Sequence, residues 1–308
     1  MPTTYPIAFG SYRADIAATG AGLRALETEK DGQPWPLTET WPAGEKPPLS
    51  AGLILAPWPN RVLDGKFTFA GVDHDLEITE PARNNASHGL VRRRDWDLLS
   101  HSESRVELTI EVGDEPGWGF PMRFGVTYEL NASGLTATHT ATNIGETAAP
   151  FGFGMHSFAR VGDVPLDECT LEFHVGVRAD LDPDRLVPVG DLVPVAGTDF
   201  DFSEPRKLAG VWLDTPFTHI AREYDGRARY VLRAPDGNGT VLWADEGLRW
   251  VQIFTADPEK GQAYPNRGRA LAIEPMSCPA NAFNSGTDLV ILEPGQMWAG
   301  SWGIHAVS

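Results

Sequence analysis

Hydrophobic and polar residues alternate along much of the chain, most clearly near its middle. The apolar residues that alternate there with polar or small ones are Phe124, Val126, Tyr128 and Leu130. Residues 131–134, Asn-Ala-Ser-Gly, have the composition of a turn, and the alternation resumes from Leu135 to Thr142. Because successive side chains of a strand point to opposite faces, this pattern predicts two half-buried strands joined by a turn.

Two further segments repeat this arrangement of strand, turn and strand. In the first, Ala70-Gly71 separates residues 66–69 from residues 72–76. In the second, the sequence Asp-Gly-Asn-Gly at 236–239 separates two alternating runs, and this is a strong turn signal. Both segments are therefore predicted to be β-hairpins, with the second running from Arg229 to Ala244.

The rest of the chain favours an all-β fold. The 32 Gly and 25 Pro are spread along the sequence, and no segment has a convincing amphipathic helical pattern. Many short strands without helices are typical of a sandwich or barrel. We expect residues 1–308 to form one large β-sandwich domain, with residues 178–204 as a long, ordered connection.

Charge and cysteine content narrow the class of protein. The chain carries 25 Lys and Arg against 42 Asp and Glu, a net charge of −17. Nucleic acids and anionic membranes would repel such a surface, so neither is expected as a partner. Cys169 and Cys278 are too far apart in sequence to indicate a disulfide framework or a zinc ribbon, and we expect two buried free thiols. No signal peptide or membrane-spanning run is evident, so a cytoplasmic location is expected.

A carboxylate is the first candidate for chemistry. In the run Ala-Leu-Ala-Ile-Glu at 270–274, a strand would place Ala270, Ala272 and Glu274 on one face. Pro275 is expected to end the strand ladder, and the small alanines would leave room for a ligand beside Glu274. The alternative is a solvent-facing glutamate on an edge strand.

A histidine has a similar setting. In Phe-Gly-Phe-Gly-Met-His at 151–156, a strand would place Gly152, Gly154 and His156 on one face. Two glycines beside a histidine indicate close approach by a ligand or by another backbone segment. The alternative is a core histidine that hydrogen-bonds a carbonyl group.

Other polar residues occur in patterns that suit a sugar. Gln252 shares a strand face with Trp250 and Phe254, and aromatic rings stack on sugar C–H faces while an amide binds hydroxyl groups. Plain core packing is the alternative. The remaining candidates lie in segments that could equally be surface loops: Asn60, Arg61, His88 and Asp214. His139 alternates with Leu135, Ala137 and Ala141 and is interpreted as structural.

Several motifs of other enzyme classes are absent from the sequence. It has no glycine-rich phosphate loop before a helix and no G-x-S-x-G elbow. No pair of histidines at helical spacing indicates zinc, and nothing indicates a nicotinamide or a flavin. We therefore expect a protein without a cofactor.

Taken together, the segments resemble the aldose 1-epimerase (galactose mutarotase) family. The motifs that carry the resemblance follow one another in the family's order: Pro59–Arg61, Gly65–Gly71, Asn85–Gly89, Gly154–Phe158, Asp214–Phe217, Val251–Thr255, Ile273–Pro275 and Leu292–Gly295. Each motif is weak alone, but the ordered set is fairly specific.

The resemblance implies a mutarotase-type supersandwich with a sugar on a concave sheet face. By position, Glu274 matches the family's catalytic base and His156 its catalytic acid. The positions that match sugar-binding residues are Arg61, His88, Asp214 and Gln252, and Asn60 is their neighbour in the first motif. The family commonly has His-Pro-Tyr-Phe where this chain has His156-Ser157-Phe158, so the resemblance does not carry over the substrate specificity.

This assignment predicts a cofactor-free isomerase that acts on a monosaccharide. Ionised Glu274 would take the proton of the C1 hydroxyl, and protonated His156 would serve the ring oxygen. A monomer or a homodimer is expected.

Three other activities are open. The first is 1-epimerisation of an anionic hexose, such as a hexose 6-phosphate or sulfoquinovose. Relatives that act on such sugars meet the anion with basic residues, whereas Arg92, Arg93 and Arg94 are interpreted here as solvated. The second is non-catalytic carbohydrate binding on the same sandwich. The third is a lyase or hydrolase, which would need a second well-placed carboxylate.

Overall fold

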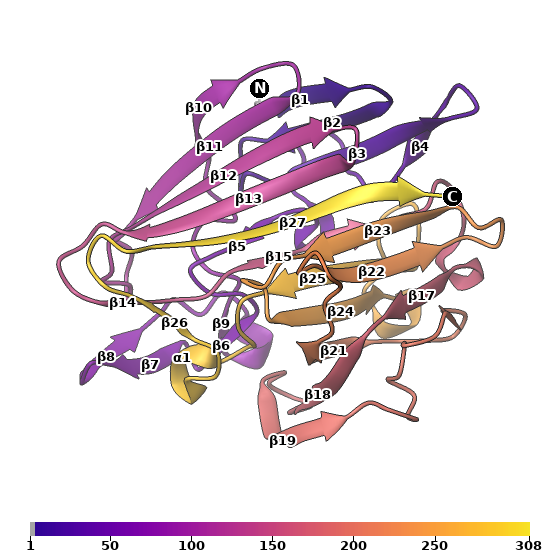
Figure 1. Cartoon of the computed structure of the whole chain (residues 1–308). Coiled ribbons are helices and arrows are strands. Elements are labelled where there is room, and N and C mark those ends of the chain that lie inside the picture. Colours follow the sequence, from indigo (N-terminus) through magenta and orange to yellow (C-terminus); the bar gives the residue numbers. More distant parts are fainter. Residues whose placement is uncertain (1–3) are drawn as a thin grey trace.

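The computed structural model describes residues 4–308, and its regular secondary structure is almost entirely β-strand (Figure 1). All three predicted hairpins are present: β12 (Met122–Asn131) with β13 (Gly134–Asn143), β7 (Lys66–Phe69) with β8 (Val72–Asp75), and β22 (Ala228–Arg233) with β23 (Gly239–Ala244). The expectation that the chain carries no signal peptide rests partly on residues 1–3. These three residues lie outside the part of the chain that the structure describes.

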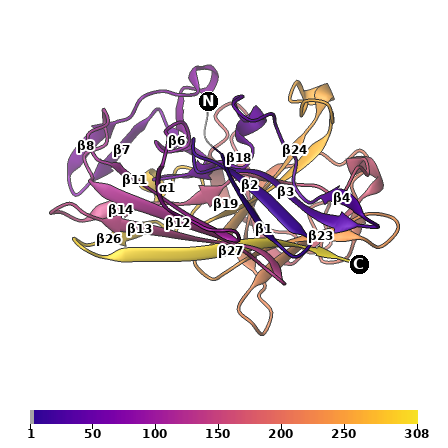
Figure 2. The same ribbon diagram turned by 90° about the horizontal axis from the view of Figure 1, so that it is seen from above.

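A nine-stranded antiparallel sheet forms one layer, in the order β10-β11-β12-β13-β27-β23-β22-β17-β20. Its remaining strands are β10 (Asp97–His101), β11 (Arg105–Val112), β17 (Thr170–Phe173), β20 (Arg206–Lys207) and β27 (Met297–Val307). The last strand of the chain, β27, lies between β13 and β23 and runs across the molecule in yellow in Figures 1 and 2. It therefore joins the two halves of this sheet.

An eight-stranded sheet forms the second layer, in the order β19-β18-β21-β24-β25-β15-β5, with β16 also pairing with β25. Its strands are β5 (Ile54–Leu55), β15 (Gly154–Met155), β16 (Ser157–Ala159), β18 (Val175–Leu181), β19 (Pro188–Pro194), β21 (Asp214–Ile220), β24 (Trp250–Ala256) and β25 (Ala270–Met276). Val251, Ile253 and Ile273 belong to the same apolar cluster as Leu242 and Ile304 of the nine-stranded sheet. One face of β24 and β25 thus belongs to the core, and Gln252 and Glu274 lie on the other face.

The remaining elements are small. They are a four-stranded sheet of β1 (Thr4–Phe9), β2 (Tyr12–Ala17), β3 (Leu23–Lys30) and β4 (Gln33–Pro36), and the pairs β6 (Arg61–Leu63) with β9 (Asn85–Ser87) and β14 (Ala149–Phe151) with β26 (Val290–Leu292). The described residues contain one short α-helix, α1 (Ala282–Ser285), and the 3-10 turns Pro48–Ser50, Pro81–Arg83, Leu166–Glu168 and Pro258–Lys260. No helix in the described part of the chain is long and apolar enough to cross a membrane.

Two sequence predictions about strands were wrong. Residues 178–204 are not a long connection, because β18 and β19 pair there as an edge hairpin. Pro275 does not end the ladder, because β25 continues to Met276 and Pro275 pairs with Val251. On its other side β25 meets β15 and β16, which are separate strands interrupted at His156. A proline, which has no N–H to donate, is tolerated where the neighbouring strand is broken.

Candidate active site

The strand register of the eight-stranded sheet brings the two principal candidates together. Gln252 of β24 is the direct cross-strand neighbour of Glu274 of β25. His156 lies at the break between β15 and β16, beside β25 on its opposite edge. The Nε2 atom of His156 is 3.3 Å from Oε1 of Glu274. The carboxyl and the imidazole are therefore within reach of a single small ligand.

These groups line a cavity of about 250 Å³ on the face of the sheet away from the core. All seven residues expected in the site line it: Asn60, Arg61, His88, His156, Asp214, Gln252 and Glu274. The volume lies slightly below that of typical ligand pockets, which range over about 300–1,000 Å³. A cavity of this size suits a monosaccharide.

Two glycines explain how the segment that carries Asn60 and Arg61 reaches the cavity. A Cβ atom on Gly154 would lie 2.7 Å from Cβ of Pro59, and one on Gly152 would lie 3.0 Å from Cδ of Pro59 and 2.5 Å from Sγ of Cys278. The close approach predicted for these glycines is thus made by another segment of the chain. Bare backbone here lets Pro59 pack against the strand.

His88 enters the cavity from a turn with an unusual backbone. Its φ is +61°, and the next residue, Gly89, has φ of +66°. A Cβ on Gly89 would lie 2.0 Å from the carbonyl oxygen of Ala56, so only glycine fits. The ring centroids of His88 and His156 are 5.7 Å apart. The two imidazoles therefore form adjacent walls of the site.

Hydrogen bonds link the polar residues across strands. The Gln252 amide donates to Oδ1 of Asp214 at 2.6 Å, and the Asn60 amide donates to Oε1 of Gln252 at 3.5 Å. Arg61 donates to Oδ1 of Asn60 at 2.8 Å. These contacts fix side chains from β21, β24 and the 60–61 segment relative to one another.

Burial controls the protonation of the site. Glu274 is 3% exposed, and burial raises its pKa well above the ordinary value; Asp214 raises it further and Arg61 lowers it. Burial also lowers the pKa of His156 to about 3. Contact with a carboxyl group would by itself favour an imidazolium, but desolvation of both groups outweighs it. Burial therefore favours a protonated Glu274 and a neutral His156 over the ion pair.

Burial also shifts the pKa values of His88 and Asp214 toward their neutral forms. Burial, with Arg92 nearby, lowers the pKa of His88 well below its ordinary value, so this imidazole is neutral. Burial raises the pKa of Asp214, against the opposing effects of Arg61 and the hydrogen bond from Gln252. The Nδ1 atoms of His88 and His156 are buried and have no hydrogen-bond partner within the described residues.

Two expectations about the surroundings of the site were wrong. Ala270 and Ala272 do not border open space, because Phe158, Phe254 and Tyr264 pack with them in a small apolar cluster. Only the end of that face at Glu274 is open. Trp250 does not line the cavity; its indole N–H donates to Asp288 at 2.7 Å. Phe254 does line it, so one aromatic of the predicted pair is available to a sugar.

Arg92 was wrongly interpreted as solvated. It is 9% exposed and lines the cavity, while Arg93 and Arg94 are exposed as expected. Burial, together with the charge of Arg93 and against the opposing effect of Glu80, lowers the pKa of Arg92 to about 10. Its nearest acceptors are the carbonyl oxygen of Ser87 at 3.2 Å and Oγ of Ser50 at 3.5 Å, and among the described residues no carboxylate forms an ion pair with it.

The sequence reasoning also missed uncharged and acidic parts of the wall: Leu49, Ser50, Thr79, Glu80, Ser87 and Gln262. They lie in turns, isolated bridges and one short strand without a periodic pattern, so no sequence signal pointed to them. Leu49 and Ser50 have positive φ values of 49° and 62°. Leucine and serine rarely adopt such values, so the sequence did not indicate this backbone conformation.

Comparison with known proteins agrees with this geometry. The profile of the family described as Aldose 1-epimerase matches residues 4–305. The uncharacterized protein YihR of Escherichia coli K12 is 32% identical over 95% of this chain and 90% of its own length. Galactose mutarotase of Sus scrofa is 26% identical over 80% of this chain and 75% of its own length.

Solved structures have the same fold. The GalM/aldose epimerase homologue from C. elegans superposes with a TM-score of 0.87 at 20% identity, covering 100% of this chain and 99% of its own. A galactose mutarotase-like protein from Clostridium acetobutylicum gives a TM-score of 0.82 at 18% identity, covering 98% and 94%. The fold and the matched profile define a mutarotase-like β-sandwich isomerase. This chain belongs to the aldose 1-epimerase family.

Proposed function

We propose that the protein interconverts the α and β anomers of a free hexose, with Glu274 and His156 as the proton-transfer pair. The observation that carries this proposal is the 3.3 Å contact between these two buried side chains in a cavity of monosaccharide size. Anomerisation requires a base for the C1 hydroxyl and an acid for the ring oxygen, and each positioned group typically contributes ~10²–10⁴-fold.

The proton count of the pair fits this reaction. Transfer of the proton from Glu274 to His156 gives a carboxylate and an imidazolium without exchange with solvent. The carboxylate then takes the C1 hydroxyl proton while the imidazolium protonates the ring oxygen, and the C1–O5 bond breaks. These two transfers return the pair to its neutral form, which burial favours. Rotation about C1–C2 and reversal of both transfers close the ring on the other face.

Polarimetry of freshly dissolved α-glucose or α-galactose tests the proposal. The wild-type protein should accelerate mutarotation, and Glu274→Gln, which keeps the shape of the side chain, should leave only the spontaneous rate. His156→Asn should slow turnover strongly while sugar binding stays measurable. A Glu274→Gln variant with the wild-type rate would contradict the assignment of the base.

A second candidate substrate is an anionic hexose, and Arg92 is the observation that favours it. A buried guanidinium without a carboxylate partner is costly, and an anionic substituent of the sugar would compensate its charge. Rates compared across neutral, phosphorylated and sulfonated hexoses distinguish the two candidates, because the acid and the base are the same in both.

A further inference from the structure

Glu80 holds Arg61 with both of its carboxylate oxygens. Nε of Arg61 donates to Oε2 of Glu80 at 2.7 Å, and NH2 of Arg61 donates to Oε1 at 3.1 Å. Such a two-point contact fixes the plane of a guanidinium as well as its position. The Arg61 side chain is 14% exposed and that of Glu80 24%, so the pair is largely shielded from water.

The remaining donors of Arg61 are free for a ligand. A guanidinium has five N–H groups, and three of them serve Glu80 and Asn60 in the described structure. The other two belong to a side chain that lines the cavity. Arg61 is also linked, through Asn60 and Gln252, to Asp214. Its orientation therefore affects the whole sugar-facing wall.

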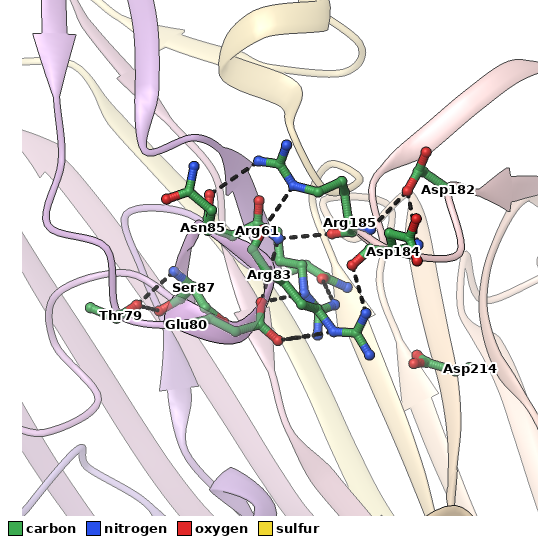
Figure 3. A network of polar contacts seen from close by, with 12 residues as sticks. Arg61, Thr79, Glu80, Arg83, Asn85, Ser87, Asp182, Asp184, Arg185 and Asp214 are labelled. Carbon is green, nitrogen blue, oxygen red and sulfur yellow. Dashed lines mark hydrogen bonds and ion pairs between the residues drawn. The ribbon is translucent and has the colours of Figure 1, made fainter.

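Glu80 is itself held in place by its surroundings, as Figure 3 shows. Its backbone pairs with that of Asn85, a fully buried residue, through N–H to O contacts of 3.0 and 3.3 Å. The Asn85 amide donates to the carbonyl oxygen of Arg185 at 2.8 Å. The turn between β18 and β19 thus supports the segment that carries Glu80.

Two arginines complete this support. Nε of Arg185 donates to the carbonyl oxygen of Arg83 at 2.8 Å, and Arg83 donates to that of Asp184 at 2.7 Å (Figure 3). Arg83 also approaches Glu80, with 3.5 Å between Nε and Oε1. The carboxylate of Glu80 therefore has a fixed position from which to orient Arg61.

We propose that Glu80 is a positioning residue of the active site, which aims the two free N–H groups of Arg61 at the sugar and balances the charge of Arg61. This inference rests on the proposed function. Glu80 acts through Arg61, and its loss leaves the guanidinium both mobile and uncompensated.

Loss of Glu80 should change the pH dependence of activity as well as the affinity for the sugar. An uncompensated positive charge disfavours proton binding by every nearby group, so both limbs of the activity profile move to lower pH. The charged and titratable groups that line the cavity with Glu274 are His156, Asp214, Arg61, His88 and Arg92, together with Glu80, which is paired with Arg61. A general loosening of the fold would not shift both limbs in one direction.

The test uses two variants of Glu80 and a matched control in the full-length protein, with α-glucose and α-galactose and, if the anionic class is preferred, a hexose 6-phosphate. Glu80→Gln should raise KM about tenfold, the effect of weakening hydrogen bonds to a charged group, and should shift both pH limbs downward. Glu80→Asp keeps the charge but shortens the side chain, so KM should rise while the limbs stay in place. Glu111→Gln removes an exposed carboxylate that contacts Arg123 on the nine-stranded sheet and should change neither property.

A double-mutant cycle with Arg61→Ala separates positioning from a structural role. If Glu80 acts through Arg61, Glu80→Gln has no further effect on KM in the Arg61→Ala protein. An additional increase there, or an unchanged KM and pH profile in the single variants, overturns the proposal. A wild-type protein that accelerates no hexose contradicts the proposed function, whereas an active wild type with unaltered Glu80 variants contradicts the role of Glu80 alone.

Discussion

His156 and Glu274 touch through Nε2 and Oε1 at 3.3 Å, although they come from strand segments more than a hundred residues apart. Both side chains are buried, and burial disfavours the charged form of each. Because neither group ionises easily alone, the proton that they share belongs to the pair and is available to either partner during the reaction.

The pH dependence of turnover should report this shared proton. We expect the pair to carry one proton at neutral pH, since burial lowers the pKa of His156 to about 3 and raises that of Glu274 well above its ordinary value. We expect a broad plateau in kcat, with losses only where a second proton is added in acid and where the last is removed in alkali. Mutarotation rates corrected for the spontaneous reaction across the pH range would show it. A fall centred on the ordinary pKa of glutamate or histidine would contradict the shared proton.

Replacement of Glu274 by Gln should stabilise the protein in a pH-dependent way. A carboxyl whose pKa is raised on folding contributes stability that is complete below its unfolded pKa and is lost as pH rises through the folded value. The wild type loses this contribution at high pH and Glu274→Gln does not. In thermal unfolding, the Tm of the variant should therefore exceed that of the wild type by more at mildly alkaline pH than at acidic pH. Glu29→Gln, at an exposed position of β3, should show no such trend.

Arg92 provides a test of substrate charge. Arg92→Met should raise KM for an anionic hexose about tenfold to a hundredfold, because a hydrogen bond to a charged group contributes about 1.5–3 kcal/mol. Rates on neutral hexoses should change little. The neighbouring, exposed Arg93→Gln serves as the control. Equal effects of Arg92→Met on neutral and anionic sugars would show that Arg92 does not recognise an anion.

Gly154 should not tolerate a methyl group. The Cβ of Gly154→Ala would lie 2.7 Å from Pro59 and 3.2 Å from Met276, and such overpacking typically costs about 1–3 kcal/mol. We expect a lower free energy of unfolding, and a higher KM because the segment of Asn60 and Arg61 is displaced. Chemical denaturation and polarimetry measure the two effects. Gly119→Ala, whose added Cβ has no neighbour within 4 Å, is the matched control and should change neither.

The sequence predicted the hairpins because their strands are half-buried, so alternation in sequence mirrors alternation in burial. β12 shows this clearly, with Met122, Phe124 and Val126 buried and the residues between them less so. In contrast, Ala179 is the one buried residue in the strands of the edge hairpin of β18 and β19, and the hairpin has no such alternation. Its Pro, Asp and Val residues therefore resembled those of a connection.

Site residues could be predicted from sequence where they lie on a strand face or in a family motif, as Gln252 and Glu274 do. They could not be predicted where tertiary packing decides the environment. Nothing in Arg-Arg-Arg distinguishes buried Arg92 from its exposed neighbours. Likewise, the contact of Glu80 with Arg61 spans 19 residues of irregular chain, which no local pattern encodes.

The central place of β27 has a consequence for how the protein is made. Residues 297–307 pair with β13 on one side and β23 on the other. Until this strand leaves the ribosome, the two portions of the nine-stranded sheet share no hydrogen-bonded neighbour, and both present unpaired strand edges. Closure of the nine-stranded sheet therefore requires β27, which is synthesised after both portions that it joins.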